Sequence, residues 1–200
     1  MKLERYLIYL VLIGFLGCQT QVNYKMIPAF SEKNILQCVI EIPSGTSKKI
    51  EYNKTSHTFE IDKKNGQERI INFLPYPGNY GFIPSTLSAT DEGGDGDALD
   101  MLVIAEALPT GTILEVIPIG MLKLLDNGAY DYKIIGVPAK KELQIITATT
   151  YTDFLKKYPK AKEIIDSWFL NYDTSDILSS EGWTNEKEAL KEIQKSLVAI

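Results

Sequence analysis

Five carboxylates occur within the ten residues from Asp91 to Asp100, and this cluster constrains the fold more than any other feature of the 200-residue chain. The segment reads Asp-Glu-Gly-Gly-Asp-Gly-Asp-Ala-Leu-Asp, and an apolar run from Met101 to Ala105 follows it directly. Carboxylates this close repel one another unless positive charge lies between them. Because the apolar run predicts a buried strand, we expect Asp100 to lie on or beside rigid structure.

Two simpler interpretations compete with a metal site. A solvated acidic loop is one, but solvated charge runs seldom end inside a core. A calcium-binding EF-hand loop is the other, and it fails because counting from Asp91 puts Leu102 where the bidentate Glu must stand. Oxygen ligands on a flexible glycine-rich loop are typical of Mg²⁺ or Ca²⁺ rather than of a transition metal.

The composition indicates one domain with a sizeable core and argues against nucleic acid as a partner. The chain is 44% hydrophobic, and its formal net charge of −5 provides no basic face for a phosphate backbone. Short apolar runs separated by turns predict strands at residues 39–42, 49–52, 59–61, 69–71, 99–105, 113–125 and 132–137. Asn65-Gly66 predicts a hairpin turn between the strands at 59–61 and 69–71.

Only the last third has a helical pattern. Thr152-Asp153 predicts the cap of a helix beginning near Phe154, and similar apolar spacings predict helices over 161–172 and 186–198. Many short strands followed by helices predict an α+β fold, a closed β-barrel with the C-terminal helices packed outside it.

The first eighteen residues resemble a bacterial lipoprotein signal. Lys2 and Arg5 precede an apolar run, Tyr6 to Leu16, which is shorter than the roughly 20 residues that span a bilayer. Cys18 follows directly, and we expect it to carry a lipid. We therefore divide the chain into a signal (1–18), a polar tether (19–33) and one domain (34–200), exported and anchored to a membrane facing the periplasm. A cytoplasmic protein with an N-terminal extension is the alternative.

Two further segments carry groups suited to binding an anion. Asp126 and Asp131 lie across a predicted turn and precede Lys133, although alone they indicate only a surface charge pair. The segment from Pro75 to Phe82 is rich in aromatic residues, which either fill a core at a bend or present phenol hydroxyls to a phosphate.

Together these elements resemble the soluble family I inorganic pyrophosphatases, over roughly Val39 to Trp183. Asp95 to Asp100 is similar to the family signature D-G-D-[PA]-x-D. That signature alone could arise by chance, but other matching segments occur in the family's order. They are Glu41-Ile42-Pro43, Lys49-Ile50-Glu51, Arg69, Asn79-Tyr80-Gly81, Asp126, Asp131-Tyr132-Lys133 and Glu181-Gly182-Trp183.

The resemblance implies a five-stranded OB-like barrel and hydrolysis of pyrophosphate that uses several Mg²⁺ ions. Asp95, Asp100 and Asp131 would hold one Mg²⁺, and Asp100 would share a second. Asp97, at the same metal site, would take the proton from the water bridging these two ions. Asp126 and Asp131 would reach further Mg²⁺ that arrives with the substrate. The resemblance also implies phosphate contacts from Lys49, Arg69, Tyr80, Lys133 and Tyr172, with Glu41 and Glu51 in the outer ring of the cavity.

The chain departs from the family pattern in three places, the mildest being Asn127, which replaces an acidic residue often found beside Asp126. Asp173 follows Tyr172 where the family commonly has a phosphate-binding lysine, and the loop after it looks shortened. The stretch between Lys54 and Arg69 also differs in length from typical bacterial members. Two alternatives therefore stay open, a hydrolase of short polyphosphate or nucleotides and a weakly active relative that binds metal and phosphate. The resemblance further implies a homo-oligomer.

Overall fold

The structure is a computed structural model that describes residues 22–199. The signal segment 1–18 and the first residues of the tether lie outside the described residues. The strands are β1 (Leu36–Ile42), β2 (Ile50–Asn53), β3 (Thr58–Ile61), β4 (Lys63–Lys64), β5 (Gln67–Glu68), β6 (Asn79–Phe82), β7 (Asp100–Val103), β8 (Ile113–Asp126), β9 (Ala129–Tyr130), β10 (Lys133–Pro138) and β11 (Leu178–Asn185). The α-helices are α1 (Tyr151–Lys157), α2 (Pro159–Phe169) and α3 (Glu186–Lys195), and the 3-10 helices are η1 (Tyr24–Met26), η2 (Thr90–Glu92) and η3 (Lys141–Leu143).

The main sheet is mixed, which together with the helices confirms the α+β class. Its strands follow the order β1-β6-β7-β10-β8-β11, β9 pairs with β8, and β8 also pairs with β1. Only β7 and β10 run parallel, and their register places Lys133 opposite Asp100. Both strands therefore begin at the same edge of the sheet, and this brings the two predicted site segments together.

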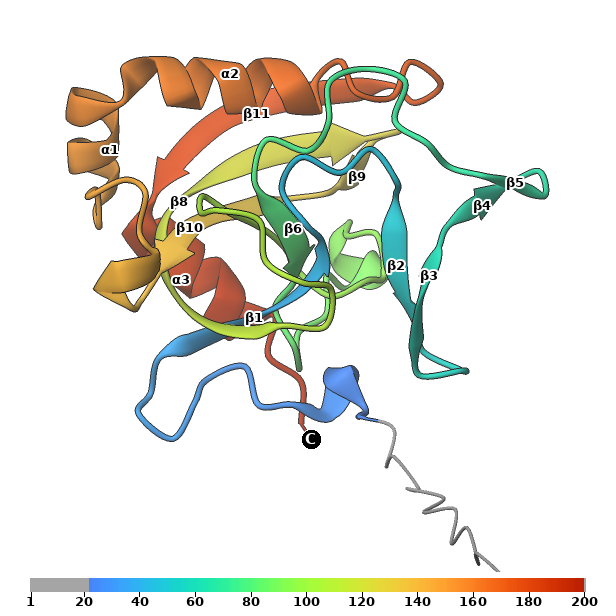
Figure 1. Ribbon diagram of the computed structural model, residues 1–200, viewed down its shortest axis with the longest axis horizontal. Coiled ribbons are helices and arrows are strands. Elements are labelled where there is room, and N and C mark those ends of the chain that lie inside the picture. The colour runs from blue at the N-terminus through green and yellow to red at the C-terminus, as the bar shows by residue number, and fades with distance from the viewer. Residues whose placement is uncertain (1–21, 200) are drawn as a thin grey trace, which may run out of the picture.

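The α-helices pack beside the main sheet (Figure 1), and the side chains that they bury are apolar. On α2, the side chains of Ile165, Trp168 and Phe169 are buried with Phe154 of α1. On α3, Ala189 and Ile193 are buried in a second cluster. No helix within residues 22–199 is long and apolar enough to cross a membrane.

The sequence prediction of the Asn65-Gly66 hairpin was right about the turn but wrong about its strands. The flanking strands are β4 and β5, of two residues each, and they form a hairpin that projects from the body of the protein (Figure 1). Residues 58–61 pair instead with β2, since Phe59 packs its ring against Tyr24 and Tyr52. Residues 69–71 form no strand, although Ile70 makes one isolated bridge to Lys48.

Two expectations for the last third were also wrong in detail. The α1 helix begins at Tyr151, because Thr150 rather than Thr152 caps it by accepting a hydrogen bond from the Asp153 N–H at 3.2 Å. The sequence did not predict β11, since its residues 179–181 are polar and exposed and show no apolar alternation. That strand lies at the end of the sheet path beside β8, where one solvated side is tolerated.

We expect Gly81→Ala to destabilise the fold by about 3 kcal/mol or more, because the new methyl group would overpack the β1–β6 pair. A Cβ at Gly81 would lie 1.9 Å from the Val39 carbonyl oxygen, and backbone atoms cannot rotate aside. Gly45→Ala is the matched control: Gly45 has a φ of +79° but open space around it, so we expect about 1–2 kcal/mol. Urea unfolding measures both. Equal losses would contradict this pairing of β1 with β6.

Candidate active site

A cavity of about 410 Å³ contains eleven of the twelve residues that the sequence predicted for the site. They are Glu41, Lys49, Glu51, Tyr80, Asp95, Asp97, Asp100, Asp126, Asp131, Lys133 and Tyr172. Arg69 alone does not line the cavity. These residues come from seven separate segments of the chain, and the fold brings their side chains together around one cavity.

Lys133 forms the centre of the buried charge in this cavity. Its side chain is 3% exposed, and its Nζ donates to Asp100 Oδ2 at 2.6 Å and to Asp131 Oδ1. Burial alone would lower the pKa of Lys133, but the two carboxylates outweigh burial and raise it. Burial raises the pKa of Asp131, and Lys133 only partly offsets this effect. The lysine is therefore a fixed cation between the two aspartates.

Asp95 and Asp97 lie on the glycine-rich loop between η2 and β7. The Asp97 backbone N–H donates to Asp95 Oδ1 at 2.9 Å, which fixes the turn between them. The Asp97 carboxylate is 65% exposed and contacts Lys54 Nζ at 2.7 Å. Beyond the loop, the Tyr80 hydroxyl donates to Asp100 Oδ2 at 2.5 Å. Each of the three aspartates that begin or precede β7 thus has a donor directed at it.

The outer part of the cavity is formed by β1 and the residues around β2. Lys49 Nζ contacts Glu51 Oε1 at 2.8 Å. Glu41 is buried, and its Oε1 accepts a hydrogen bond from the Tyr52 N–H at 2.7 Å. Tyr172 also lines the cavity, and its ring stacks on Trp168 with ring centroids 4.8 Å apart, which holds the phenol at the cavity.

Comparison with known proteins gives the family. Residues 38–200 match the family model described as inorganic pyrophosphatase. The chain belongs to the inorganic pyrophosphatase family. An inorganic pyrophosphatase of Neisseria meningitidis serogroup B is 35% identical over 176 residues, which are 88% of this chain and 94% of the relative.

Solved structures of inorganic pyrophosphatases have the same fold as this family member. The enzyme from Thermus thermophilus is similar at a TM-score of 0.75 and 30% identity, over 88% of this chain and 97% of that chain. A truncated vacuolar soluble pyrophosphatase of Trypanosoma cruzi, solved in complex with PPi, is similar at a TM-score of 0.73 and 26% identity, over 86% of this chain and 70% of that chain.

Asp173, which stands where the family commonly has a lysine, forms an ion pair with Arg69. The Arg69 guanidinium donates to Asp62 Oδ2 at 2.9 Å and to Asp173 Oδ2 at 2.7 Å. The hydroxyl and backbone N–H of Ser175 also donate to Asp173, and together with Arg69 they lower the pKa of that carboxyl although burial opposes them. Asp173 is absent from the cavity lining. Its carboxylate is therefore paired with Arg69 and is not presented to the cavity.

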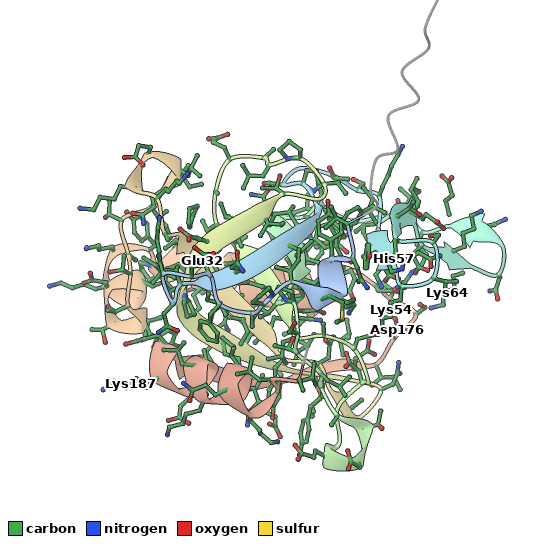
Figure 2. All side chains as sticks on the ribbon, turned by 90° about the horizontal axis from the view of Figure 1, so that it is seen from below. Glu32, Lys54, His57, Lys64, Asp176 and Lys187 are labelled. Carbon is green, nitrogen blue, oxygen red and sulfur yellow. The ribbon has the colours of Figure 1, made fainter. Side chains whose placement is uncertain are left out.

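The hairpin β4–β5 contacts the same loop. Lys64 Nζ donates to Ser175 Oγ at 2.6 Å and lies 3.6 Å from Asp176 Oδ1. Figure 2 shows Lys64 and Asp176 on the side of the molecule that also carries Lys54 and His57. Two of the three segments in which the sequence departs from the family thus contact each other.

Two lysines of the cavity were missed by sequence reasoning. Lys25 lies in the polar segment that we interpreted as a tether, and Lys54 lies in a turn after β2. Neither has a periodic pattern or a motif around it, so nothing in the sequence alone indicated them. Only the docking of residues 22–27 against the domain reveals Lys25.

The oxygen ligands of the cavity suit a hard divalent cation. Within residues 22–199, no three Asp, Glu, His or Cys side chains converge closely enough to hold a metal ion, and lysine ammonium groups contact Asp97, Asp100 and Asp131 instead. Seven carboxylates nevertheless line this cavity, and its lining contains no Cys, Met or His side chain. Oxygen ligands alone are the donor set that Mg²⁺ prefers. The residues fit such an ion, provided that the ammonium groups move aside when it binds.

We expect the stability of the metal-free protein to fall as pH rises from about 4.5 to about 8. Burial raises the pKa of Glu41 to about 8 from an ordinary value of 4.5. Between those values the folded protein keeps a proton that the unfolded protein has released, so unfolding becomes easier by about 2–4 kcal/mol across the range. Above pH 8 this contribution should be constant.

Glu41→Gln should remove the part of this slope between about pH 6 and pH 8, because glutamine does not titrate. The Asp131 carboxyl, whose pKa burial raises to about 6, still contributes to the slope at lower pH. Glu32→Gln, a change at an exposed carboxylate (Figure 2), is the control and should keep the whole slope. Urea unfolding in EDTA at several pH values measures the free energy of unfolding. An unchanged slope in Glu41→Gln would show that Glu41 titrates normally.

Proposed function

We propose that this chain is a Mg²⁺-dependent inorganic diphosphatase that hydrolyses pyrophosphate to two orthophosphates. The observation that carries the proposal is the convergence of eleven predicted site residues on one cavity, in a chain that belongs to the inorganic pyrophosphatase family. Members of this family depend on metal ions, and one relative was solved with PPi bound. The homo-oligomer that the resemblance implies stays a prediction.

Asp95, Asp100 and Asp131 would hold the first Mg²⁺, with Asp97 beside them and Asp126 reaching ions that arrive with the substrate. When bound, the ions supply positive charge to the phosphates and acidify the attacking water. Asp97 accepts the proton from that water, a role that suits a carboxylate whose 65% exposure leaves it accessible. The loop fixes its position through the hydrogen bond from the Asp97 N–H to Asp95.

Lysines and tyrosines of the chain stabilise the charge that develops on the leaving phosphate. Lys133 and Tyr80 each direct a donor at Asp100, and a phosphoryl oxygen would compete for the same donors. Lys49 and Tyr172 line the cavity wall and complete the set. Positioning and preorganised charge of this kind are the main contributions to catalysis of phosphoryl transfer.

The rival function, hydrolysis of short polyphosphate or nucleotides, rested on the loss of a cation at position 173. Because the Asp173 carboxylate binds Arg69 and does not line the cavity, this loss leaves the remaining cavity cations in place. We therefore favour pyrophosphate. We further interpret the five strands β1, β6, β7, β10 and β8, which pair in a circuit, as the OB-like closed barrel.

We expect release of phosphate from pyrophosphate to exceed that from tripolyphosphate or ATP, and to stop when EDTA removes Mg²⁺. Asp97→Asn should lower kcat by about two to four orders of magnitude, because it removes the proton acceptor. Asp91→Asn, at an exposed aspartate of η2 outside the cavity, should keep parental kcat. Steady-state kinetics measures each. Parental turnover in Asp97→Asn would refute the assignment, and full activity without metal would refute the mechanism.

We also propose that Cys18 is lipidated and that the mature protein is anchored to a membrane. The basic start and the short apolar run before Cys18 support this, although these residues lie outside the described part of the chain. Mass spectrometry of natively expressed protein should find an N-terminal lipidated cysteine, and Cys18→Ala should leave an unprocessed precursor. An intact, unmodified Met1 to Cys18 segment would instead indicate the cytoplasmic alternative.

A further inference from the structure

The cavity contains four lysines and seven carboxylates, so the pairing of each lysine matters for an anionic ligand. Lys49 pairs with Glu51, Lys54 with Asp97, and Lys133 with Asp100 and Asp131. In the described part of the chain, no carboxylate lies within ion-pair distance of the fourth lysine, Lys25. Its ammonium is thus the one cavity cation there whose charge no protein carboxylate neutralises directly.

Lys25 is held in place by its backbone. Residues 22–27, here named the N-terminal strap, pass over the edge of the domain near β6 and β2. The Ser85 hydroxyl donates to the Ile27 carbonyl at 2.7 Å and is 3.3 Å from the Lys25 carbonyl. The Tyr52 hydroxyl accepts from the Tyr24 N–H and lies 3.2 Å from the Val22 carbonyl. The strap is therefore an ordered part of the site wall.

The Lys25 side chain lies at the cavity wall, where its ammonium packs over the ring of Phe82. Its Nζ lies 4.6 Å from the centroid of the Phe82 ring, a cation–π contact at the cavity wall. Burial lowers the pKa of Lys25, and the nearby Lys54 lowers it further, although Asp97 and Glu41 oppose both. Because this ammonium is partly removed from water, the approach of an anion stabilises its charge and lowers the free energy of the site.

We propose that Lys25 is a phosphate-binding residue of this cavity and contacts the phosphoryl group on the Asp97 side. The proposal deepens the proposed function and rests on it. Arg69 is engaged by Asp62 and Asp173, and no lysine follows Tyr172. Lys25 supplies a cation from the N-terminal strap, and within the described residues no carboxylate forms an ion pair with it.

Lys25→Met tests the proposal while keeping the aliphatic packing on Phe82. The probe is methylenediphosphonate, a non-hydrolysable analogue of pyrophosphate, titrated calorimetrically with saturating Mg²⁺. We expect about tenfold weaker binding, the effect of losing one charge-assisted contact, and a similar rise in KM with little change in kcat. Lys25→Arg should restore most of the affinity. Lys33→Met, at an exposed lysine outside the cavity, is the matched control and should bind as the parent does.

Mg²⁺ titration without the analogue separates a phosphate contact from a structural role. Removing a cation from an acidic cavity should leave Mg²⁺ affinity unchanged or raise it a few-fold, whereas a disturbed cavity would bind both ligands more weakly. Parental affinity of Lys25→Met for the analogue, or weaker binding of Mg²⁺ and analogue together, would overturn the proposal. If the parent chain binds the analogue but releases no phosphate from pyrophosphate, the proposed function fails and the role of Lys25 is still decided by the binding data.

Discussion

Lys133, Asp100 and Asp131 form a charged cluster that is largely shielded from water, and the rest of the site is arranged around it. An ammonium that is 3% exposed is stable only with carboxylate partners, since an unpaired buried charge costs several kcal/mol. The partners reach it because β7 and β10 pair in parallel with Lys133 opposite Asp100. A register shift of one residue would turn Met101 or Ile134 to this face and break the cluster. The buried charge thus specifies the register, and the glycine-rich loop that carries Asp95 and Asp97 lies directly before β7.

Pairing between lysines and carboxylates is also found in the rest of the cavity. Seven carboxylates and four lysines leave an excess of negative charge, in keeping with the net charge of −5 of the chain. Three of the lysines contact carboxylates, and each contact lowers the repulsion between the carboxylates of the cavity. Divalent ions would take over this role and release lysine ammonium groups for phosphate. Metal and substrate binding should therefore be coupled through the lysines.

The sequence was sufficient to predict the parts of the site that lie in motifs or next to apolar runs. Asp95 and Asp97 precede, and Asp100 begins, a strand whose burial was evident from its composition. The α+β class followed from the order of strands and helices. Lys25 was missed because its position depends on hydrogen bonds from Tyr52 and Ser85, which are distant in sequence. Strand β11 was missed for a related reason, since its pairing with β8 rather than its own residues makes it a strand.

The contact between Arg69 and Asp173 shows why a residue role could not be transferred from position to position. Considered alone, Asp173 replaces a cation by an anion and suggests a weakened phosphate site. In the structure its charge is taken up by Arg69, and the hairpin β4–β5 contacts the same loop through Lys64 and Ser175. Two of the three segments in which the chain departs from the family pattern are therefore in direct contact. Arg69 is engaged by two carboxylates and does not line the cavity, whereas the N-terminal strap brings Lys25 to the cavity wall. The positive charge that the cavity lacks at Arg69 is therefore partly supplied by a residue from a distant segment.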